Sequence, residues 1–243
     1  MENYFNVNIE FNKDKVDQII VNTIQMGGKG YVCSIEGNNI AHCQIDQHFC
    51  NVVNNSLVNI CDGSSIAILA SIIHKKRLST YIGADLFIGF IKKKKYKSFF
   101  LGNTPEILRA LQSNLSSIDP LISDMEFQTL PFCDVNDFNY SKIAEKINTN
   151  NPDIIWVSLG APKQELFMNK LLPFLTRGIM FGFGAIFNFY ARVDKTKRAP
   201  KIILKFRLEW LYRLIVEPKK QSKRLGNYLS LLPRMIYEEL KYK

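Results

Sequence analysis

A carboxylate and a hydroxyl stand at the ends of two apolar segments near the start of the chain. Asp62 directly follows the apolar segment 57–61, and Ser34 lies near the end of the segment 30–35. A carboxylate between a strand and a helix can act as a general base, bind a sugar or ribose hydroxyl, or cap the helix, and Gly63 lets a ligand approach the backbone closely. From these residues alone, capping is the favoured role for Asp62, and Ser34 is a candidate to supply a hydroxyl to the same site.

Two loops further along the chain have the composition of anion-binding sites. Residues 154–158 are apolar or β-branched almost throughout, which is typical of a strand buried on both faces of a parallel sheet. The loop 159–162 follows, and its Pro162 suits the first turn of a helix. The loop 102–104 also lies between a strand and a helix, with Thr104 as a candidate cap. Because free backbone N–H groups and the helix dipole point out of such junctions, both loops are predicted to face phosphate.

The sequence lacks the motifs of other nucleotide-binding and metal-dependent proteins. No GxGxxG follows an apolar segment and no Walker A loop is present, so ATPase and nicotinamide-dependent activities have no motif behind them. The histidines His42, His48 and His74 have no ligand spacing, and the nearest carboxylate pair is Asp134 and Asp137. A nucleotide diphosphate would be neutralised by helix N-termini and by Arg or Lys side chains, and we predict neither a metal site nor a cofactor.

A repeated alternation of strands and helices positions these loops. We predict strands at 4–9, 30–35, 57–61, 98–101, 126–131, 154–158 and 178–182, and helices at about 16–24, 38–53, 66–73, 105–115, 140–147 and from 162. Short connections between them favour an α/β fold with a doubly wound, mostly parallel, Rossmann-like sheet. The pattern is weak between 75 and 97, where the charge run 92–95 is interpreted as a solvated loop.

The excess charge is concentrated at the C-terminal end. The 243 residues carry a formal net charge of +10, with 32 Lys and Arg against 22 Asp and Glu. Residues 1–194 hold 18 basic and 18 acidic residues, whereas residues 195–243 hold 14 and 4. We therefore predict an α/β domain at 1–194 and a basic, amphipathic helical appendage at 195–243. Such an excess favours an anionic partner, either a nucleic acid or an anionic membrane surface.

The appendage combines basic and apolar positions. Lys219, Lys220, Lys223 and Arg224 lie beside apolar residues at 225, 228, 229, 232, 235 and 236, which suits a helix lying on an anionic membrane. The alternative is that these apolar residues pack on the protein's own core or on another subunit. Aromatic residues are not interleaved with the basic ones as a base-stacking surface requires, so binding to nucleic acid is disfavoured.

Cysteine usage and hydropathy indicate the compartment. The five cysteines are an odd number without a CxxC pair, which indicates reduced thiols in a cytosolic protein. The first ten residues have no signal-peptide pattern, and no segment approaches the roughly 18 continuous apolar residues of a spanning helix. We expect the protein to be cytoplasmic and to reach the inner face of the cell membrane only peripherally.

Several motifs together resemble a known family. They are GYVC at 30–33, DG at 62–63, Gly83 with Asp85 and Leu86, FFLGNTPE at 99–106, PDIIWVSLGAPKQE at 152–165, GFGAIFNF at 182–189, RAP at 198–200 and LEWLYRLIVEP at 208–218. In this order and spacing the chain resembles the WecG/TagA/CpsF glycosyltransferases (glycosyltransferase family 26) nearly from end to end. The resemblance implies a bacterial enzyme of cell-surface polysaccharide or teichoic acid synthesis. It would add a sugar, N-acetylmannosamine in the best-known members, from a UDP donor to a lipid-diphosphate-linked GlcNAc.

The resemblance also assigns roles to particular residues of the catalytic domain and the appendage. Asp62 falls on the family's proposed general base, which reverses the preference for capping, and Ser34 falls where the family usually has Thr. The family's appendage closes over the active site and meets the membrane and the lipid diphosphate. The residues expected to bind substrate are Gly63, Gly102, Asn103, Gly160, Lys163, Gln164, Gly184, Asn188, Arg198, Arg213 and Arg224.

The expected reaction is a single inverting displacement that needs no metal ion. Asp62 would accept the proton of an acceptor hydroxyl as that oxygen attacks the anomeric carbon of the UDP-sugar. Helix N-termini at Gly102 and Gly160, with Arg side chains, would neutralise the leaving diphosphate. Two alternatives stay open: a non-catalytic accessory subunit of a partner glycosyltransferase, and, with less support, a basic nucleic-acid-binding protein. A homo-oligomer is compatible with either enzymatic or accessory function.

Overall fold

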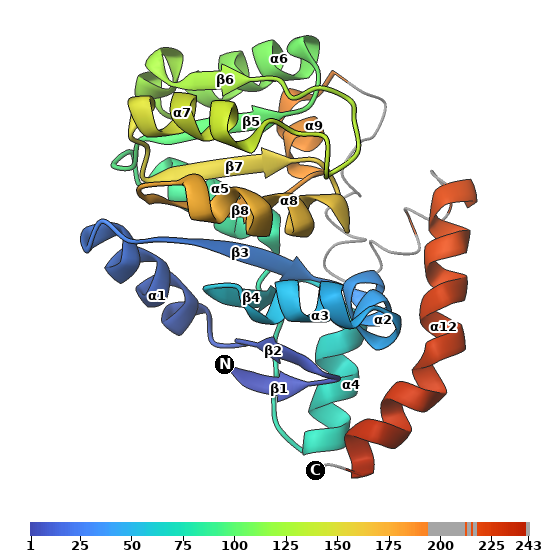
Figure 1. The fold of residues 1–243 in the computed structure, drawn as a ribbon. Helices are drawn as coiled ribbons and strands as arrows, with labels where there is room; N and C mark the ends of the chain where they lie inside the picture. The colour runs from blue at the N-terminus through green and yellow to red at the C-terminus, as the bar shows by residue number, and fades with distance from the viewer. Residues whose placement is uncertain (194–211, 213–214, 216–217, 242–243) are drawn as a thin grey trace.

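A six-stranded parallel sheet forms the centre of the protein. The computed structural model describes residues 1–193, 212, 215 and 218–241. The strand order is β4-β3-β8-β7-β5-β6, and Figure 1 shows the strands running in one direction. The strands are β3 (Lys29–Ile35), β4 (Val58–Cys61), β5 (Ser98–Gly102), β6 (Glu126–Gln128), β7 (Ile154–Ser158) and β8 (Gly178–Gly182). The predicted doubly wound, Rossmann-like α/β fold is therefore confirmed.

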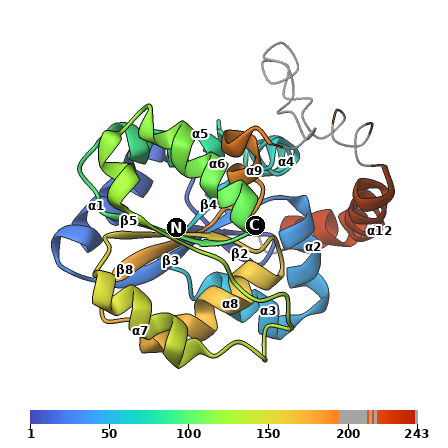
Figure 2. The ribbon, with the colours of Figure 1, turned by 90° about the horizontal axis from the view of Figure 1, so that it is seen from above.

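Helices cover both faces of this sheet. Those with bounds close to the predicted ones are α1 (Lys13–Gln25), α4 (Ser64–His74), α6 (Pro105–Ser116), α7 (Tyr140–Asn150) and α8 (Lys163–Leu171). Figure 2 shows α1, α6 and the short α9 (Ile186–Ala191) on one side of the strands, and α7 and α8 on the other. Because side chains alternate along a strand, Trp156 faces the first layer whereas Val157 faces the second. Both faces of the sheet are thus buried, as the apolar strands predict.

The order of the strands creates a topological switch point. The chain leaves β5 outward to β6, but it leaves β7 in the opposite direction to β8. Ligands of open α/β sheets bind where two neighbouring connections diverge in this way. The loops that follow β5 and β7 are the two predicted to face phosphate, and they meet at this point of the sheet.

Three predicted elements differ from those observed. The expected strand 4–9 is a hairpin of β1 (Glu2–Tyr4) and β2 (Val7–Ile9), because Phe5 and Asn6 have φ of 54° and 66° and form a two-residue turn. The expected helix 38–53 is two helices, α2 (Gly37–Ile45) and α3 (Gln47–Asn54), since Asp46 caps the second by accepting from Phe49 N. The strand expected at 126–131 ends at Gln128.

The weakly patterned segment 75–97 contains a helix that the prediction missed. This is α5 (Gly83–Lys92), and its buried residues include Leu86, Phe87, Phe90 and Ile91 at helical spacing. The charge run that follows is exposed at Lys93, Lys94 and Lys95, as expected of a solvated segment. The helix matters for the site because the backbone N–H of its first residue, Gly83, donates to the predicted catalytic carboxylate of Asp62.

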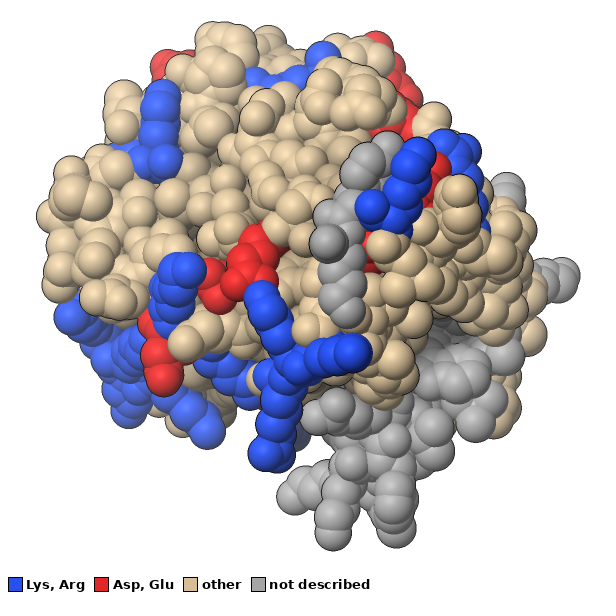
Figure 3. Space-filling view, turned by 90° about the horizontal axis from the view of Figure 1, so that it is seen from below, with Lys and Arg blue, Asp and Glu red and all other residues tan. Residues whose placement is uncertain are grey.

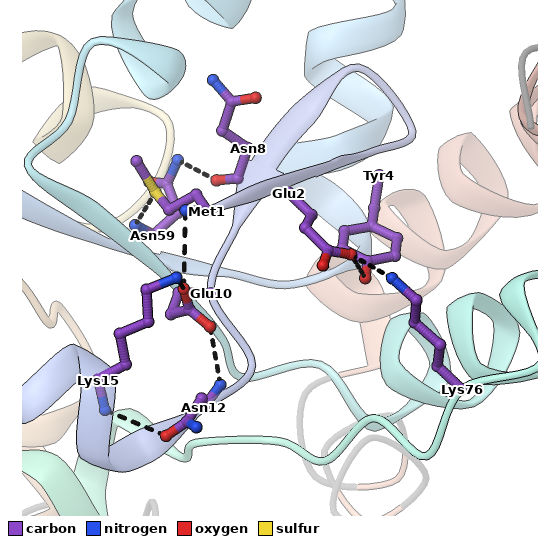
Figure 4. A network of polar contacts seen from close by, with 9 residues as sticks. All are labelled: Met1, Glu2, Tyr4, Asn8, Glu10, Asn12, Lys15, Asn59 and Lys76. Atoms are coloured by element: carbon purple, nitrogen blue, oxygen red, sulfur yellow. Dashed lines mark hydrogen bonds and ion pairs between the residues drawn. The ribbon is translucent and has the colours of Figure 1, made fainter.

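The N-terminal hairpin covers the β4 edge of the sheet. Glu10 N donates to Asn59 O at 2.9 Å, and the Asn59 amide donates to Asn8 O at 2.8 Å. Figure 4 shows the surrounding network, in which Glu10 meets the Lys15 ammonium at 2.7 Å. A hollow of about 540 Å³ lies beside the hairpin, between the start of α1 and residues 76–79. Of its lining residues, Glu10 pairs with Lys15 and Glu2 pairs with Lys76, and Figure 3 shows acidic and basic side chains side by side on this face.

All five cysteines are free, and all except Cys133 are buried. Burial raises the pKa of the Cys61 thiol to about 12, so this thiol stays protonated at neutral pH. Within the part of the chain that the structure describes, we find no helix with the length and apolarity that crossing a bilayer requires.

The C-terminal helix α12 (Pro218–Lys241) packs along the protein's own core. Figure 1 shows it beside α2, with its C-terminal end near α4. Tyr228 and Met235 are buried, Leu232 and Ile236 are partly buried against the same core, and Leu229 stays exposed. The alternative that the apolar residues pack on the core is thus observed for most of them. The predicted boundary at 194/195 lies outside the described residues, so the division into two domains stays a prediction.

Glu239, near the end of α12, forms polar contacts with the hairpin turn and with the end of α4. Its Oε2 accepts a hydrogen bond of 2.7 Å from Phe5 N in the hairpin turn, and its Oε1 lies 2.7 Å from His74 Nε2 at the end of α4. By contrast, the neighbouring Glu238 pairs with Arg234 of its own helix, where the Arg side chain is 62% exposed.

Glu239→Ala is expected to destabilise the protein by about 1–3 kcal/mol, because Phe5 N–H and His74 both lose their partner in a partly buried place. Glu238→Ala is the matched control and should change the free energy of unfolding by less than about 0.5 kcal/mol, as exposed pairs do. Urea unfolding of the two variants checks this. Equal effects at both positions would show that Glu239 does not fasten the helix.

Candidate active site

Asp62 and Ser34 come together at the carboxyl ends of β4 and β3. Because these strands are parallel neighbours with Cys61 beside Ile35, the residues around their ends share one edge of the sheet. Ser34 Oγ donates to Asp62 Oδ2 at 2.9 Å, and Gly83 N donates to Asp62 Oδ1 at 3.3 Å. The carboxylate is half-buried and each of its oxygens accepts one of these two bonds, so two elements orient it.

The capping role considered for Asp62 is not observed at the helix that follows it. Gly63 is the N-cap residue of α4, and no side chain caps that helix. The Asp62 carboxylate instead accepts from Gly83, the first residue of α5. A carboxylate at a helix N-terminus is stabilised by the positive end of the helix dipole. Asp62 is therefore held as an oriented group at the sheet edge, as a general base must be.

A second polar cluster joins the loops after β5, β7 and β8. The Asn103 amide donates to Ser158 Oγ at 3.1 Å and to Asn188 Oδ1 at 2.8 Å. Ser158 Oγ in turn donates to Gly184 O at 2.8 Å. Gly102 precedes the cluster with φ of +100°, a backbone conformation that favours glycine. Three of the residues predicted to bind substrate, Asn103, Gly184 and Asn188, thus lie in one hydrogen-bonded group at the switch point.

Gln164 connects the loop after β7 to the loop after β8. Its Oε1 accepts from Gly160 N at 3.2 Å and from Gly184 N at 3.1 Å. Its Nε2 donates to Gly182 O at 2.9 Å and to Glu165 Oε1 at 3.1 Å. All the hydrogen-bonding capacity of this amide is met by the protein, and the side chain is buried. In this structure Gln164 shapes the predicted donor loops from within.

The two loops approach so closely that Gly184 admits no side chain. A Cβ at this position would lie 2.7 Å from Gly160 N and 2.8 Å from Gly160 Cα. Gly184→Ala should force the loops apart and raise the KM for the donor by about tenfold or more, since small displacements of positioning groups are costly.

Gly89→Ala is the matched control for Gly184→Ala, because a Cβ at Gly89 in α5 meets nothing within 4 Å. This variant should keep the wild-type KM and gain about 0.5–1 kcal/mol of stability from helix propensity. Steady-state kinetics measures the KM for the donor in both variants. An unchanged KM in Gly184→Ala would mean that the contact between the loops does not shape the donor site.

Glu165, the last residue of the GAPKQE motif, is completely buried beneath these loops. Its Oε1 accepts from the Gln164 amide at 3.1 Å and from the Asn39 amide at 3.3 Å. Burial, aided by the nearby Glu36 carboxylate, raises the pKa of Glu165 to about 7. Asn39 also accepts from Glu36 N at 3.2 Å at the start of α2. A buried polar chain therefore links the β3–α2 junction beside Ser34 to the loops held by Gln164.

The comparison with known families is consistent with this arrangement. A model of the glycosyl transferase WecG/TagA/CpsF family matches residues 3–243. The chain belongs to the WecG/TagA/CpsF family of glycosyl transferases. In this glycosyltransferase, the two polar clusters thus lie at the edge of the sheet where an α/β enzyme binds its substrates.

Two relatives of this WecG/TagA/CpsF glycosyltransferase have the same name and activity. One is the N-acetylglucosaminyldiphosphoundecaprenol N-acetyl-beta-D-mannosaminyltransferase of Bacillus subtilis (strain 168), 28% identical over 201 residues, which cover 81% of this chain and 76% of the relative. The enzyme of the same name from Bacillus spizizenii (strain ATCC 23059 / NRRL B-14472 / W23) is 27% identical over 185 residues, which cover 75% of this chain and 67% of the relative.

Among the remaining predicted site residues of this glycosyltransferase, Lys163 makes its described contacts away from the two clusters. Lys163 points toward the 132–138 loop, where its ammonium donates to Cys133 O and lies 5.0 Å from the centre of the Phe138 ring. Arg198 and Arg213 lie outside the described residues, and of Arg224 only the backbone, within α12, is described. Their roles in substrate binding stay predictions.

Sequence reasoning missed several residues of the site. Gly83 donates to Asp62, and Ser158 accepts from Asn103. Asn39 and Glu165 form the buried polar chain beneath the loops. The apolar spacing of 86, 87, 90 and 91 was a usable signal for the helix that begins at Gly83. A carboxylate on the apolar face of α8 was a signal for Glu165, because buried acids are rare outside functional sites.

Metal ligands are also not assembled in this part of the fold. Among the described residues, no three His, Cys, Asp or Glu side chains lie close enough together to hold an ion.

Proposed function

We propose that this protein transfers N-acetylmannosamine or a related hexose from a UDP-sugar to a lipid-diphosphate-linked sugar. The observation that carries the proposal is the Asp62 carboxylate, held by Ser34 and Gly83 at the sheet edge in a member of this family. The activity named for the two Bacillus relatives supports N-acetylmannosamine and GlcNAc-diphosphoundecaprenol as first candidates for donor sugar and acceptor. The product would enter the synthesis of a cell-surface polysaccharide or teichoic acid.

The reaction we propose is a single displacement with inversion. Asp62 accepts the proton of the acceptor hydroxyl, the acceptor oxygen forms a bond to the anomeric carbon, and the bond from that carbon to UDP breaks. Ser34 orients Asp62 through its bond of 2.9 Å. The diphosphate leaves against the backbone N–H groups near Asn103 and Gly160, where charge that develops in the transition state is stabilised.

A donor screen tests the proposal. UDP release is measured from UDP-N-acetylmannosamine, UDP-N-acetylglucosamine, UDP-glucose and UDP-galactose, each with and without a lipid-diphosphate-GlcNAc analogue. We expect acceptor-dependent release from UDP-N-acetylmannosamine or from one related donor. UDP binding without release from any donor would contradict the enzymatic proposal and favour an accessory subunit.

We also propose that turnover is independent of divalent metal ions. The described residues hold no cluster of three His, Cys, Asp or Glu side chains, and a helix N-terminus can meet a diphosphate without a metal ion. An excess of EDTA should leave the rate within about twofold of its value in added Mg²⁺, because no Lewis acid takes part in the proposed step. A loss of activity on chelation that Mg²⁺ or Mn²⁺ restores would contradict this part of the proposal.

Contact with the inner face of the cell membrane is proposed for the C-terminal appendage. Leu229 on α12 is 52% exposed, and basic residues precede it in the sequence. An apolar and basic helix surface of this kind binds anionic lipid. Flotation with vesicles that contain or lack anionic lipid measures the binding of the protein to each kind of membrane. Binding that is absent, or equal on both kinds of vesicle, would contradict the proposal.

A further inference from the structure

The Glu165 carboxyl is buried, and the residues that the structure describes place no cation against it. The residue lies in the first turn of α8 and its exposed fraction is 0%. Its Oε1 accepts from two neutral amides, those of Gln164 and Asn39, whereas Oε2 has no hydrogen-bond partner. Among the described residues, no Lys, Arg or His pairs with it. A charged carboxylate in such a place is costly, because it loses its hydration and receives no opposite charge.

The titratable groups around Glu165 do not favour its charged form. Cys33 faces it from β3, and Glu36 and Cys43 face it from the two ends of α2. Cys50 on α3 adjoins Cys43 and is also a thiol. Strands β7 and β8 carry no titratable side chain, and the charged side chains of α7, at 142, 145 and 146, are exposed to solvent. Burial and the Glu36 carboxylate both act in the direction of protonation, and the pKa of Glu165 is about 7.

Glu165 also lies next to the loops that would bind the donor. Its neighbour Gln164 holds Gly160 N and Gly184 N through a single oxygen, and Glu165 Oε1 holds the other end of that amide. A donor diphosphate at these loops would bring negative charge close to the buried carboxyl. In a poorly solvated interior the two negative charges repel strongly, so bound donor and ionised Glu165 disfavour each other.

We propose that Glu165 is a proton-linked positioning residue of the donor site, so that binding of the anionic donor is accompanied by proton uptake at its carboxylate in the molecules in which that group is ionised. The proton passes from solvent to Oε2, the oxygen without a partner, and no bond of the donor changes. The inference rests on the proposed function, since it takes the ligand to be a nucleoside diphosphate sugar. Its consequence is that donor affinity falls as Glu165 ionises, because binding and protonation are reciprocally linked.

Calorimetry with UDP-N-acetylmannosamine tests this inference, because the diphosphate of a UDP-sugar is a diester without a group that titrates near neutral pH. The binding heat is measured near the Glu165 pKa in buffers of different ionisation enthalpy. We expect the heats to differ by the equivalent of about half a proton taken up per donor bound. The dissociation constant should rise about tenfold from pH 6 to pH 8.

Two variants separate a proton-linked role from a merely structural one. Glu165→Gln keeps the neutral shape of the side chain and should bind donor with buffer-independent heat and a pH-independent affinity. Glu145→Gln, at an exposed position of α7, is the matched control and should behave as the wild type. Circular dichroism shows whether each variant is folded. The calorimetry in different buffers uses the wild-type protein, so it tests the proton uptake even if a variant does not fold.

The outcomes distinguish the inference from the proposed function beneath it. Binding heat that is identical in all buffers would overturn the proton linkage while leaving the function intact. Proton uptake that persists in Glu165→Gln would assign the linkage to another group and overturn the role of Glu165. No binding heat in any buffer would overturn the UDP-sugar site itself, and the inference with it.

Discussion

Asp62→Asn is expected to lower turnover by roughly 10²–10⁴-fold while leaving UDP binding nearly intact, because the amide keeps the shape of the carboxylate but cannot accept the acceptor proton. The Ser34 and Gly83 bonds hold the side chain at the sheet edge, apart from the cluster around Asn103 that we propose to face the diphosphate. The expected signature is therefore a fall in kcat with little change in UDP affinity. Single-turnover kinetics and calorimetry with UDP measure the two quantities separately.

Controls for this variant come from the same sheet edge and from the surface. Ser34→Ala should cost about tenfold in kcat by releasing the carboxylate, and Ser34→Thr should restore most of it because the hydroxyl is kept. Asp124→Asn, at an exposed position, should leave the rate unchanged. Turnover near the wild-type level in Asp62→Asn would show that Asp62 is not the base.

The stability of the wild-type protein is expected to fall by about 3 kcal/mol as pH rises from 4.5 to above 7, on account of Glu165 alone. The folded-state pKa is about 7 against an ordinary value of 4.5, so in this range the folded state binds more protons than the unfolded one. The stabilisation is fully present below the unfolded pKa and is lost as pH rises through the folded pKa.

Glu165→Gln should remove this dependence and be more stable than the wild type at pH 8, because a neutral amide replaces a charge that has no partner. Urea unfolding at a series of pH values measures the free energy of unfolding of each protein. Glu145→Gln is the control for the loss of one exposed charge. If wild type and Glu165→Gln showed the same pH profile, the buried carboxyl would not be the group that titrates.

Most of the sheet could be predicted from the sequence because its strands are buried on both faces and read as continuous apolar segments. The failures have local causes. The turn at Phe5 and Asn6 requires left-handed backbone at two residues without glycine, and the break before Gln47 depends on a cap by Asp46 inside a continuous apolar pattern. Neither feature changes the composition of its segment, so neither could be read from periodicity.

The sequence could predict the site residues that stand at the ends of strands. It could not predict all the residues that form hydrogen bonds with them. Asp62, Asn103 and Gly160 stand where strands end, and parallel strands place their carboxyl ends at one edge. The groups that hold two of them come from distant parts of the chain: Gly83, from an overlooked helix, donates to Asp62, and Ser158, at the end of β7, accepts from Asn103. The interior position of Gln164 depends on the approach of Gly160 to Gly184, which only the packing of two loops creates.

The most direct test of the account is to isolate the product formed from UDP-N-acetylmannosamine and a lipid-diphosphate-GlcNAc analogue and to determine its anomeric configuration by NMR. We expect a disaccharide whose new linkage has the configuration opposite to that of the donor, formed by the wild type and not by Asp62→Asn. A product with retained configuration would contradict the single displacement. Equal product from the Asp62→Asn variant would contradict the role of Asp62.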